Sequence, residues 1–409
     1  MRISRDARLV LAAQAVRAFA YGLGAVLLGT TLAERGLSSL AAGVVLAAVV
    51  AGTVVSSLAV ARWGDRFGRR RFYGCLYAAL AVVGVVFAYA SSLWLLVPVA
   101  LTGALSAEVV ESGPFTSLEQ AMLATELTGR SRVRGFGVYN AVATAAGSLG
   151  ALAAALPGLL RQVWSGAPAD ERWFWLFAPA AVAGVVLARR LSSAVEATPA
   201  FTGSTAAPVE RAPAGRLGAS RPVVRRLSGL FAIDSFGGGF VVQSFIAFWL
   251  TRRFGATTAT VGVLFFAFGI LQTASFITAP RLAERFGLLP TMVFTHLPSN
   301  LLLIAVAFAP NIGVAVGLLA ARVALSQMDV PTRQAYVMAV VTPEERTAAA
   351  AYTNTARYVV RPVGPALAGA AASTALGAPF VIAGTIKSGY DLLLWSRFRH
   401  VPLAEEVDV

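Results

Sequence analysis

The chain of 409 residues is 57% hydrophobic and only 13% charged, with a mean hydropathy of +0.70. Soluble domains carry about 25% charged residues, so this composition excludes an ordinary soluble protein and is typical of a polytopic membrane protein. The net charge of +14 would indicate nucleic-acid binding in a soluble protein. Here it reflects arginines in the loops between apolar segments, and we expect no nucleic-acid partner.

Twelve apolar runs follow one another along the chain, and each is long enough for a membrane crossing of about 20 residues. They cover residues 9–32, 40–61, 72–91, 94–118, 135–157, 173–191, 227–250, 258–280, 289–309, 311–333, 347–372 and 377–396. The sequence therefore predicts an all-α membrane protein with twelve transmembrane helices.

Residues 193–224 interrupt this series, because they are rich in Pro, Ala, Ser, Thr and Arg and contain no apolar run. Such a composition is typical of a flexible linker. We therefore expect an N-terminal six-helix bundle over residues 1–192, a cytoplasmic linker over 193–224 and a C-terminal six-helix bundle over 225–409.

Arginines are concentrated in alternate loops: the N-terminal tail, the loop after the second run and the linker. Cytoplasmic loops of membrane proteins collect Arg and Lys. We therefore expect an integral protein of the cytoplasmic (plasma or inner) membrane, embedded in the lipid bilayer, with both termini cytoplasmic. A single cysteine, Cys75, and two histidines, His296 and His400, indicate no disulfide framework, no metal site and no cofactor.

Polar and small residues recur at a nearly constant spacing along the two halves of the chain. The matching pairs are Gln120 with Gln334, Asn140 with Asn354 and Gly150 with Gly364, at a spacing of 214, and Gly22 with Gly239, at a spacing of 217. This repeat predicts two pseudo-symmetric bundles that move against each other, which is how secondary transporters are built.

A cationic turn lies between the second and third runs and contains Asp65, Arg66, Gly68 and Arg69. A weaker copy follows 219 positions later, with Glu284 and Arg285 before Gly287. The first copy resembles the cytoplasmic signature of the major facilitator superfamily, Gly-x-x-x-Asp-Arg-x-Gly-Arg-Arg, except that Ala61 replaces the first glycine. The resemblance covers the whole chain, including the two six-helix halves and the central linker.

The resemblance implies that the carboxylate and arginines of the turn latch the two halves together in the outward-facing state. This role falls to Asp65, Arg66 and Arg69, with Gly68 allowing the tight turn, and to Glu284 and Arg285 in the second copy. The alternative is that the arginines only enforce topology, which is our interpretation of Arg70 and Arg71.

Charged residues inside the apolar runs carry the functional information, because an ionisable group in the hydrocarbon region is costly unless it is paired or hydrated. In the repeat, Arg17 aligns with Asp234 and Glu108 aligns with Arg322. The resembled fold places all four on cavity-lining helices. Either Arg17 pairs with Glu108 and Asp234 with Arg322 inside each half, or Arg17 pairs with Asp234 as a gate across the halves. The glycines that follow Asp234, residues 237–239, indicate close packing or a break in the helix.

Two polar stripes extend these positions at helical spacing. The first stripe contains Glu108, Ser112, Phe115 and Glu119, and the equivalent stripe contains Arg322, Ser326, Asp329 and Arg333. We interpret Glu119 and Arg333, near the cytoplasmic ends, as structural. Glu111 lies three residues from Glu108 and would suit a proton-carrying pair, unless Arg17 holds Glu108 ionised.

The eleventh run carries Asn354, Arg357 and Arg361 on one helical stripe. Two buried guanidinium groups one turn apart can clamp an anion. The alternative is that these arginines neutralise Asp234, Asp329 or another neighbouring carboxylate.

The sequence predicts a secondary active transporter, because no nucleophile, metal or acid–base set has the spacing of an enzyme. The resemblance and the aromatic-rich C-terminal half favour export of drug-like compounds or metabolites, and the carboxylates inside the apolar runs favour coupling to protons, as in an antiporter. The Gly-Pro-rich signature of antiporters, however, has only a poor match at residues 147–150. The runner-up substrate is an organic or phosphorylated anion bound by the arginines of the eleventh run. We expect a monomer whose partners are a small-molecule substrate and protons, the latter carried by Glu108, Glu111, Asp234 and Asp329.

Overall fold

The computed structural model describes residues 4–90, 92–108, 113–126, 130–168, 170–196, 217–342 and 345–401. These residues form helices and connecting turns and contain no β-strand. By contacts between Cα atoms the chain divides into two compact units, made of Met1–Pro199 with Val242–Ile270 and of Ala200–Val241 with Leu271–Val409. Glu111 of the predicted proton-carrying pair lies outside the described residues.

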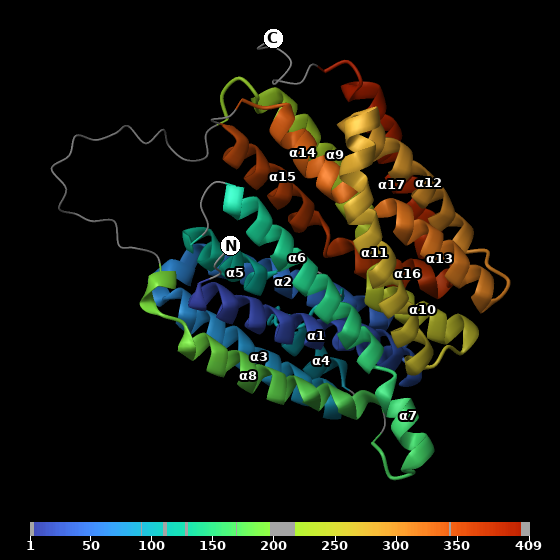
Figure 1. Ribbon diagram of the computed structural model, residues 1–409. Helices are drawn as coiled ribbons and strands as arrows, with labels where there is room; N and C mark the ends of the chain where they lie inside the picture. The colour runs from blue at the N-terminus through green and yellow to red at the C-terminus, as the bar shows by residue number, and fades with distance from the viewer. Residues whose placement is uncertain are drawn as a thin grey trace. The chain divides into compact units, whose positions relative to one another are not determined.

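The first unit is built around a long first helix. Its helices are α1 (Arg5–Glu34), α2 (Ser39–Phe67), α3 (Arg69–Tyr89), α4 (Leu93–Ala100), α5 (Pro114–Glu126), α6 (Arg130–Ala153), α7 (Leu156–Val163), η1 (Asp170–Leu176), α8 (Phe177–Arg190), η2 (Ser193–Val195) and α10 (Gln243–Phe254). Figure 1 shows α1 lying beside α6, and α3 beside α8. α1 also packs against α10, which comes from the second half of the sequence. The hydroxyl of Ser244 donates there to the carbonyl oxygens of Ala25 at 2.9 Å and Ala107 at 3.1 Å.

The second unit contains α9 (Arg221–Gly239), α12 (Leu288–Val306), α13 (Ile312–Ser326), α14 (Asp329–Ala339), α15 (Arg346–Val360), α16 (Val363–Thr374) and α17 (Ala378–Phe398). α11 (Thr258–Phe286) begins in the first unit and ends in the second. α12 packs along α17, and α9 packs along α15 and α17. The polar residues of α9, α12 and α17 are thereby brought to one place.

Six of the predicted runs, the fourth to the seventh, the tenth and the eleventh, are not single helices. The fourth run, predicted as a helix over 94–118, stops at Ala100 and resumes at Pro114. Pro98 lies inside α4, and Gly103 adopts a φ of +70°, which favours glycine. Glu108 therefore lies in non-helical chain, and the predicted stripe from Glu108 to Glu119 is wrong.

The other breaks are short. The fifth run divides between Ala153 and Leu156, and the sixth consists of the 3-10 helix η1 followed by α8. The seventh run divides between Gly239 and Gln243, directly after the three glycines that follow Asp234. The tenth divides between Ser326 and Asp329, and the eleventh between Val360 and Val363. An interrupted helix does not keep one helical phase, so side-chain positions cannot be extrapolated across these breaks.

Glycines allow the same helix crossing in both units. A Cβ added at Gly150 of α6 would lie 1.9 Å from the carbonyl oxygen of Phe19 in α1. At Gly364 of α16, an added Cβ would lie 2.6 Å from the Cα of Gly239 in α9. Gly150 and Gly364 are repeat equivalents, and so the crossing of α1 with α6 recurs as the crossing of α9 with α16.

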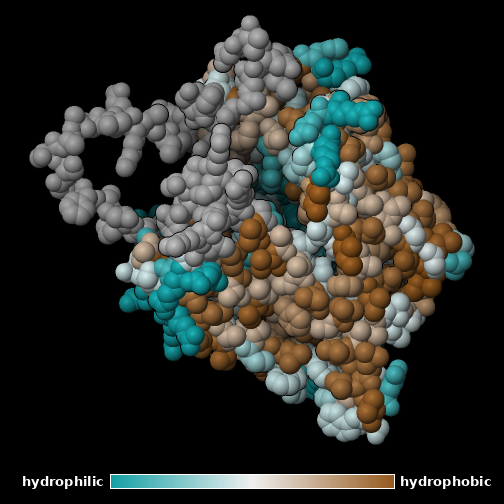
Figure 2. All heavy atoms as spheres, in the orientation of Figure 1, coloured by the Kyte–Doolittle hydropathy of each residue, from teal (hydrophilic) through white to brown (hydrophobic). Residues whose placement is uncertain are grey.

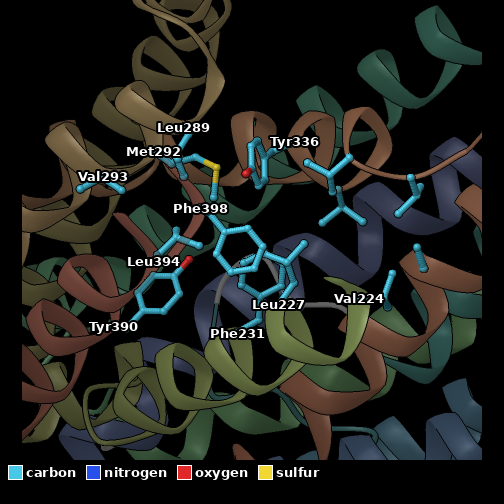
Figure 3. Packing of buried hydrophobic residues seen from close by; sticks show 14 residues of the cluster. Val224, Leu227, Phe231, Leu289, Met292, Val293, Tyr336, Tyr390, Leu394 and Phe398 are labelled. Atoms are coloured by element: carbon cyan, nitrogen blue, oxygen red, sulfur yellow. The ribbon is translucent and has the colours of Figure 1, made fainter. Parts of the chain in front are cut away.

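An apolar cluster holds the second unit together beside its buried charges. It contains Val224, Leu227, Phe231, Leu289, Met292, Val293, Tyr336, Val337, Val340, Val341, Ala349, Tyr390, Leu394 and Phe398. Figure 3 shows the aromatic rings of Phe231, Tyr390 and Phe398 gathered in this cluster. Because Phe231 lies one turn from Asp234, and Tyr390 adjoins Asp391, the packing of this cluster fixes the neighbouring charged side chains.

The surface and the helix lengths fit a bilayer. Within the described residues, nine helical segments are long and apolar enough to cross a membrane. Large hydrophobic side chains such as Val55, Val82, Ile277 and Phe308 are exposed. On the face drawn in Figure 2, hydrophobic side chains cover most of the surface and hydrophilic ones gather toward its margins. The protein is an all-α integral membrane protein.

We expect Gly150→Ala and Gly364→Ala to destabilise the protein, because the added methyl group forces two helix backbones apart. Overpacking of this kind costs about 1–3 kcal/mol. Gly74→Ala and Gly389→Ala are matched controls in helices, where an added Cβ meets no atom within 4 Å. Thermal unfolding of the detergent-solubilised variants measures the effect. Equal midpoints for the crossing and control variants would contradict the close-packing role.

Candidate functional site

Each unit contains a buried ion pair between its first helix and a later helix. In the first unit, Arg17 of α1 binds Glu119 of α5 in a bidentate pair. The distances are 3.0 Å from Nε to Oε1 and 2.7 Å from Nη2 to Oε2. The side chains are only 4% and 0% exposed. A parallel two-bond pair of this kind is among the strongest side-chain contacts.

Aromatic residues complete the environment of this first pair. Tyr73 donates to Glu119 Oε1 at 2.7 Å, and Tyr139 donates to Oε2 at 2.6 Å. The guanidinium carbon of Arg17 lies 5.2 Å from the ring centre of Tyr21, a distance at which a cation is attracted to the ring face. Each oxygen of Glu119 thus accepts two hydrogen bonds, and the pair is fully satisfied without a substrate.

This arrangement corrects the predicted pairings. The partner of Arg17 is Glu119, which neither predicted pairing contains, and in the second unit Asp234 contacts Arg333. Glu119 and Arg333 are repeat equivalents at a spacing of 214, as Arg17 and Asp234 are at 217. The same ion pair therefore occurs in both units with its charges reversed. The predicted pairings rested on the repeat alignment of Glu108 with Arg322, whereas the structure pairs Arg17 with Glu119 and Asp234 with Arg333.

The pair in the second unit belongs to a larger cluster of charges around Asp234. The ammonium group of Lys387 forms a salt bridge with its Oδ1. Arg333 Nη1 lies 3.4 Å from Oδ2, Arg357 Nη2 lies 4.0 Å from Oδ2, and His296 Nε2 lies 3.8 Å from Oδ1. Asp234 is 3% exposed, so a single buried carboxylate is surrounded by three cations and an imidazole.

Two further carboxylates balance these cations. Asp329 lies one turn before Arg333 on α14 and accepts from its Nη1 at 2.6 Å. Asp391 of α17 lies 2.9 Å from His296 Nδ1. With the imidazole neutral, the three carboxylates match the three cations in number, which is the condition for burying such a cluster at tolerable cost.

Several residues of this cluster were not among the predicted site residues. They are His296 and Asn300 on α12, Arg333 on α14, and Lys387 and Asp391 on α17. α12 and α17 correspond to the ninth and twelfth runs, whereas the resemblance drew attention to the first, fourth, seventh and tenth. A signal was present: Lys387 is the only lysine of the chain, and it lies inside an apolar run.

The other predicted residues differ in their burial and in the elements that carry them. Glu108 is half-buried and its backbone N–H donates to the hydroxyl of Ser106 at 3.1 Å. Arg322 is half-buried on α13, Asn354 is exposed on α15, and Arg361 caps the end of α15. Arg357, an arginine of the predicted anion clamp, approaches Asp234. This position agrees with the alternative prediction that Arg357 neutralises that carboxylate.

The cationic turn has a carboxylate that sequence inspection did not identify. Gly68 has a φ of +94° and joins α2 to α3. Glu196 accepts from the backbone N–H groups of Arg69 at 2.6 Å and Arg70 at 3.3 Å, at the positive end of α3. The Arg69 guanidinium donates to the carbonyl oxygen of Val195 at 3.3 Å.

The second copy of the turn has the same backbone form. Gly287 has a φ of +90° between α11 and α12, close to that of Gly68. Glu284 and Arg285 are exposed, as is Arg66 in the first copy. The side chain of Asp65 lies outside the described residues, so the latch remains a prediction.

The comparisons with known proteins agree over nearly the whole chain. Residues 10–365 match the family model of the Major Facilitator Superfamily. An uncharacterised membrane protein of Saccharomyces cerevisiae, YJR124C, is 27% identical, over 97% of this chain and 94% of the yeast protein.

Solved transporters share the fold at low sequence identity. A mutant form of the nucleoside transporter NupG is 14% identical with a TM-score of 0.72, covering 97% of this chain and 100% of NupG. A bacterial homologue of the human lysosomal transporter Spinster is 16% identical with a TM-score of 0.71, covering 97% of each chain. The xylose transporter XylE from E. coli is 14% identical with a TM-score of 0.68, covering 97% of this chain and 96% of XylE. The chain therefore belongs to the major facilitator superfamily and is a transporter, not an enzyme.

Proposed function

We propose that the protein is a secondary active transporter that moves a small organic molecule by alternating access and couples this movement to protons. The observation that carries the proposal is the buried cluster around Asp234 in the second unit. Ionisable residues are retained inside membrane proteins at a cost and mark substrate or proton pathways. The cluster joins five helices, α9, α12, α14, α15 and α17, so a change in its charge acts on all of them.

The contrast between the two units supports placing the coupling site in the second. Glu119 is enclosed by Arg17, Tyr73 and Tyr139, and its bonds are short and complete. In contrast, Arg333 approaches Asp234 at only 3.4 Å and Arg357 at 4.0 Å. We propose that the first pair is a static anchor and that the second has become the centre that changes during transport.

The proposed direction is export of drug-like compounds or metabolites, as the resemblance implies. A membrane orientation with both termini in the cytoplasm and action as a monomer belong to the same proposal. The aromatic side chains of Phe245, Phe248 and Trp249, which could have formed a lipophilic pocket, are buried in the core of the first unit. These buried side chains stabilise the fold and give no argument for a drug-like substrate.

Arg357 favours a second candidate, an organic or phosphorylated anion. Its side chain is 27% exposed, more than that of Arg333 or Lys387. Its buried Nε atom has no hydrogen-bond partner among the described residues. An arginine that is partly accessible and incompletely bonded can accept a carboxylate or phosphate. The human organic anion transporter MFSD10 shares the fold, with a TM-score of 0.57.

The coupling proposal predicts different effects for the two equivalent ion pairs. Asp234→Asn/Lys387→Gln removes a positive and a negative charge together, so Asp329 and Asp391 still match Arg333 and Arg357 in number. We expect this variant to retain substrate exchange but to lose stimulation by a pH gradient in proteoliposomes. Arg17→Gln/Glu119→Gln is the matched control in the first unit, and its residual transport should still respond to the gradient. A wild-type flux that ignores both the gradient and a protonophore would refute proton coupling.

The substrate proposal is tested by a compound screen with a strain that lacks the gene. We expect the strain to be hypersensitive to lipophilic cations, and the wild-type gene should restore its resistance. Hypersensitivity confined to organic anions would instead favour the second candidate. In that case Arg357→Gln should raise KM about tenfold or more, because a hydrogen bond to a charged group contributes roughly 1.5–3 kcal/mol.

The latch proposal predicts an effect on turnover rather than on affinity. Asp65→Asn should lower kcat about fivefold or more, the lower end of typical coupling between conformational states, with little change in KM. Arg70→Ala is the control, because we assign its side chain to topology and its N–H bond to Glu196 does not depend on that side chain. Equal losses in the two variants, or loss of Asp65→Asn from the membrane fraction, would show that the turn is structural.

A further inference from the structure

His296 lies on α12 between two carboxylates that come from different helices. Its Nδ1 is 2.9 Å from Asp391 Oδ1, and its Nε2 is 3.8 Å from Asp234 Oδ1. Asn300, one turn further along α12, donates to Asp391 Oδ2 at 2.8 Å. A carboxylate held in this way keeps the proton of a neutral imidazole on Nδ1. The lone pair of Nε2 then faces Asp234.

We propose that His296 Nε2 is the atom that takes up and releases the transported proton. This inference rests on the proposed proton coupling and narrows it to one group that the predicted proton carriers did not include. In the uptake step, the lone pair of Nε2 forms an N–H bond with a proton of a hydronium ion, whose O–H bond breaks to leave water, and the positive charge passes to the ring. In the release step, that bond breaks, the electron pair returns to Nε2, and the proton passes to water.

Uptake of this proton upsets the charge balance of the cluster and so changes the contacts of its cations. With His296 neutral, Asp234, Asp329 and Asp391 offset Arg333, Arg357 and Lys387. Protonation adds a positive charge beside Asp234 Oδ1, the oxygen that already binds Lys387. Like charges at one buried oxygen repel each other, so a cation must loosen. Arg357 is the most accessible of the three and is 4.0 Å from Asp234. It is therefore the cation that turns toward water or substrate.

Charged groups lie on several sides of His296, and most of them belong to the cluster around Asp234. α13, which also packs against α12, carries Arg322 as its one charged residue. The titratable and charged groups on the other neighbouring helices are Asp234 of α9, Asp329 and Arg333 of α14, Arg357 of α15, and Lys387, Tyr390 and Asp391 of α17.

The first unit has no equivalent of this imidazole. The spacing of 219 that relates Gly68 to Gly287 places Tyr77 at the position of His296. The hydroxyl of Tyr77 donates to the carbonyl oxygen of Ala13 at 2.7 Å. A phenol committed to a backbone acceptor does not exchange protons near neutral pH. The proposed carrier therefore has no counterpart at the equivalent position of the first unit.

Nitrogen NMR observes the proposed carrier directly, because the chain has only two histidines. His400 is exposed at the end of α17, so the His400→Gln protein, labelled with ¹⁵N-histidine in lipid nanodiscs, shows His296 alone. We expect a neutral form protonated at Nδ1 that gains a proton as pH falls. Asp391→Asn should weaken the preference for a proton on Nδ1, because it removes the carboxylate that accepts this proton. A ring protonated at Nε2, or one that does not titrate over about pH 5–9, would overturn the inference.

Transport separates this inference from the broader proposal. In proteoliposomes with a substrate identified by the compound screen, His296→Gln should retain counterflow exchange and lose stimulation by a pH gradient. His400→Gln, the matched control, should keep both. If the wild-type and His296→Gln proteins respond equally to the gradient, His296 is not the carrier but proton coupling stands. If the wild-type protein does not respond, both proposals fail. The NMR experiment keeps the inference testable even if His296→Gln does not fold, because it leaves His296 intact.

Discussion

Every charge inside this protein must have a partner, because the bilayer offers no water to stabilise it. This requirement determines which helices of each unit are fixed to one another. In the first unit, Arg17 and Glu119 join α1 to α5, and the tyrosines of α3 and α6 attach to the same carboxylate. In the second unit, Asp234 brings α9, α12, α14, α15 and α17 together through ionic contacts. Apolar packing alone would not select these neighbours, because lipid is as apolar as the helix faces.

The two units show how a duplicated framework can keep its geometry while its chemistry diverges. The helix crossings at Gly150 and Gly364 are equivalent, and so are the turns at Gly68 and Gly287. The ion pair has been kept at equivalent positions, but its charges are reversed. Around it, the first unit surrounds a carboxylate with phenols, and the second surrounds one with cations and an imidazole. Where a glycine touches the backbone of another helix, no larger residue fits. A buried ion pair, in contrast, tolerates exchange of its two charges between the two positions.

Much of the fold could be predicted from the sequence, because long apolar runs and alternating arginine-rich loops reflect the bilayer directly. The site could be predicted only in part. Arg17 and Asp234 stood out as charges in apolar helices, but their partners depend on the phase of α5 and α14, which lie beyond helix breaks. Near this break, Gly103 packs against the backbone of Gly52, a long-range contact that the local sequence pattern does not reveal. His296 and Asp391 were missed because their helices, α12 and α17, are not among those that the resemblance places at the cavity.

The position of Lys387 has a consequence for studying the protein. It is the only lysine in the chain, its side chain is 8% exposed, and it is bound to Asp234. Amine-directed chemistry, which usually modifies many surface sites at once, is therefore confined to the N-terminal amine and this one buried group. A small, membrane-permeant acylating reagent would react with Lys387 only when its ammonium group leaves Asp234 and gives up its proton. The rate of that reaction, read by mass spectrometry of the peptide that contains Lys387, would report how often the interior of the second unit opens.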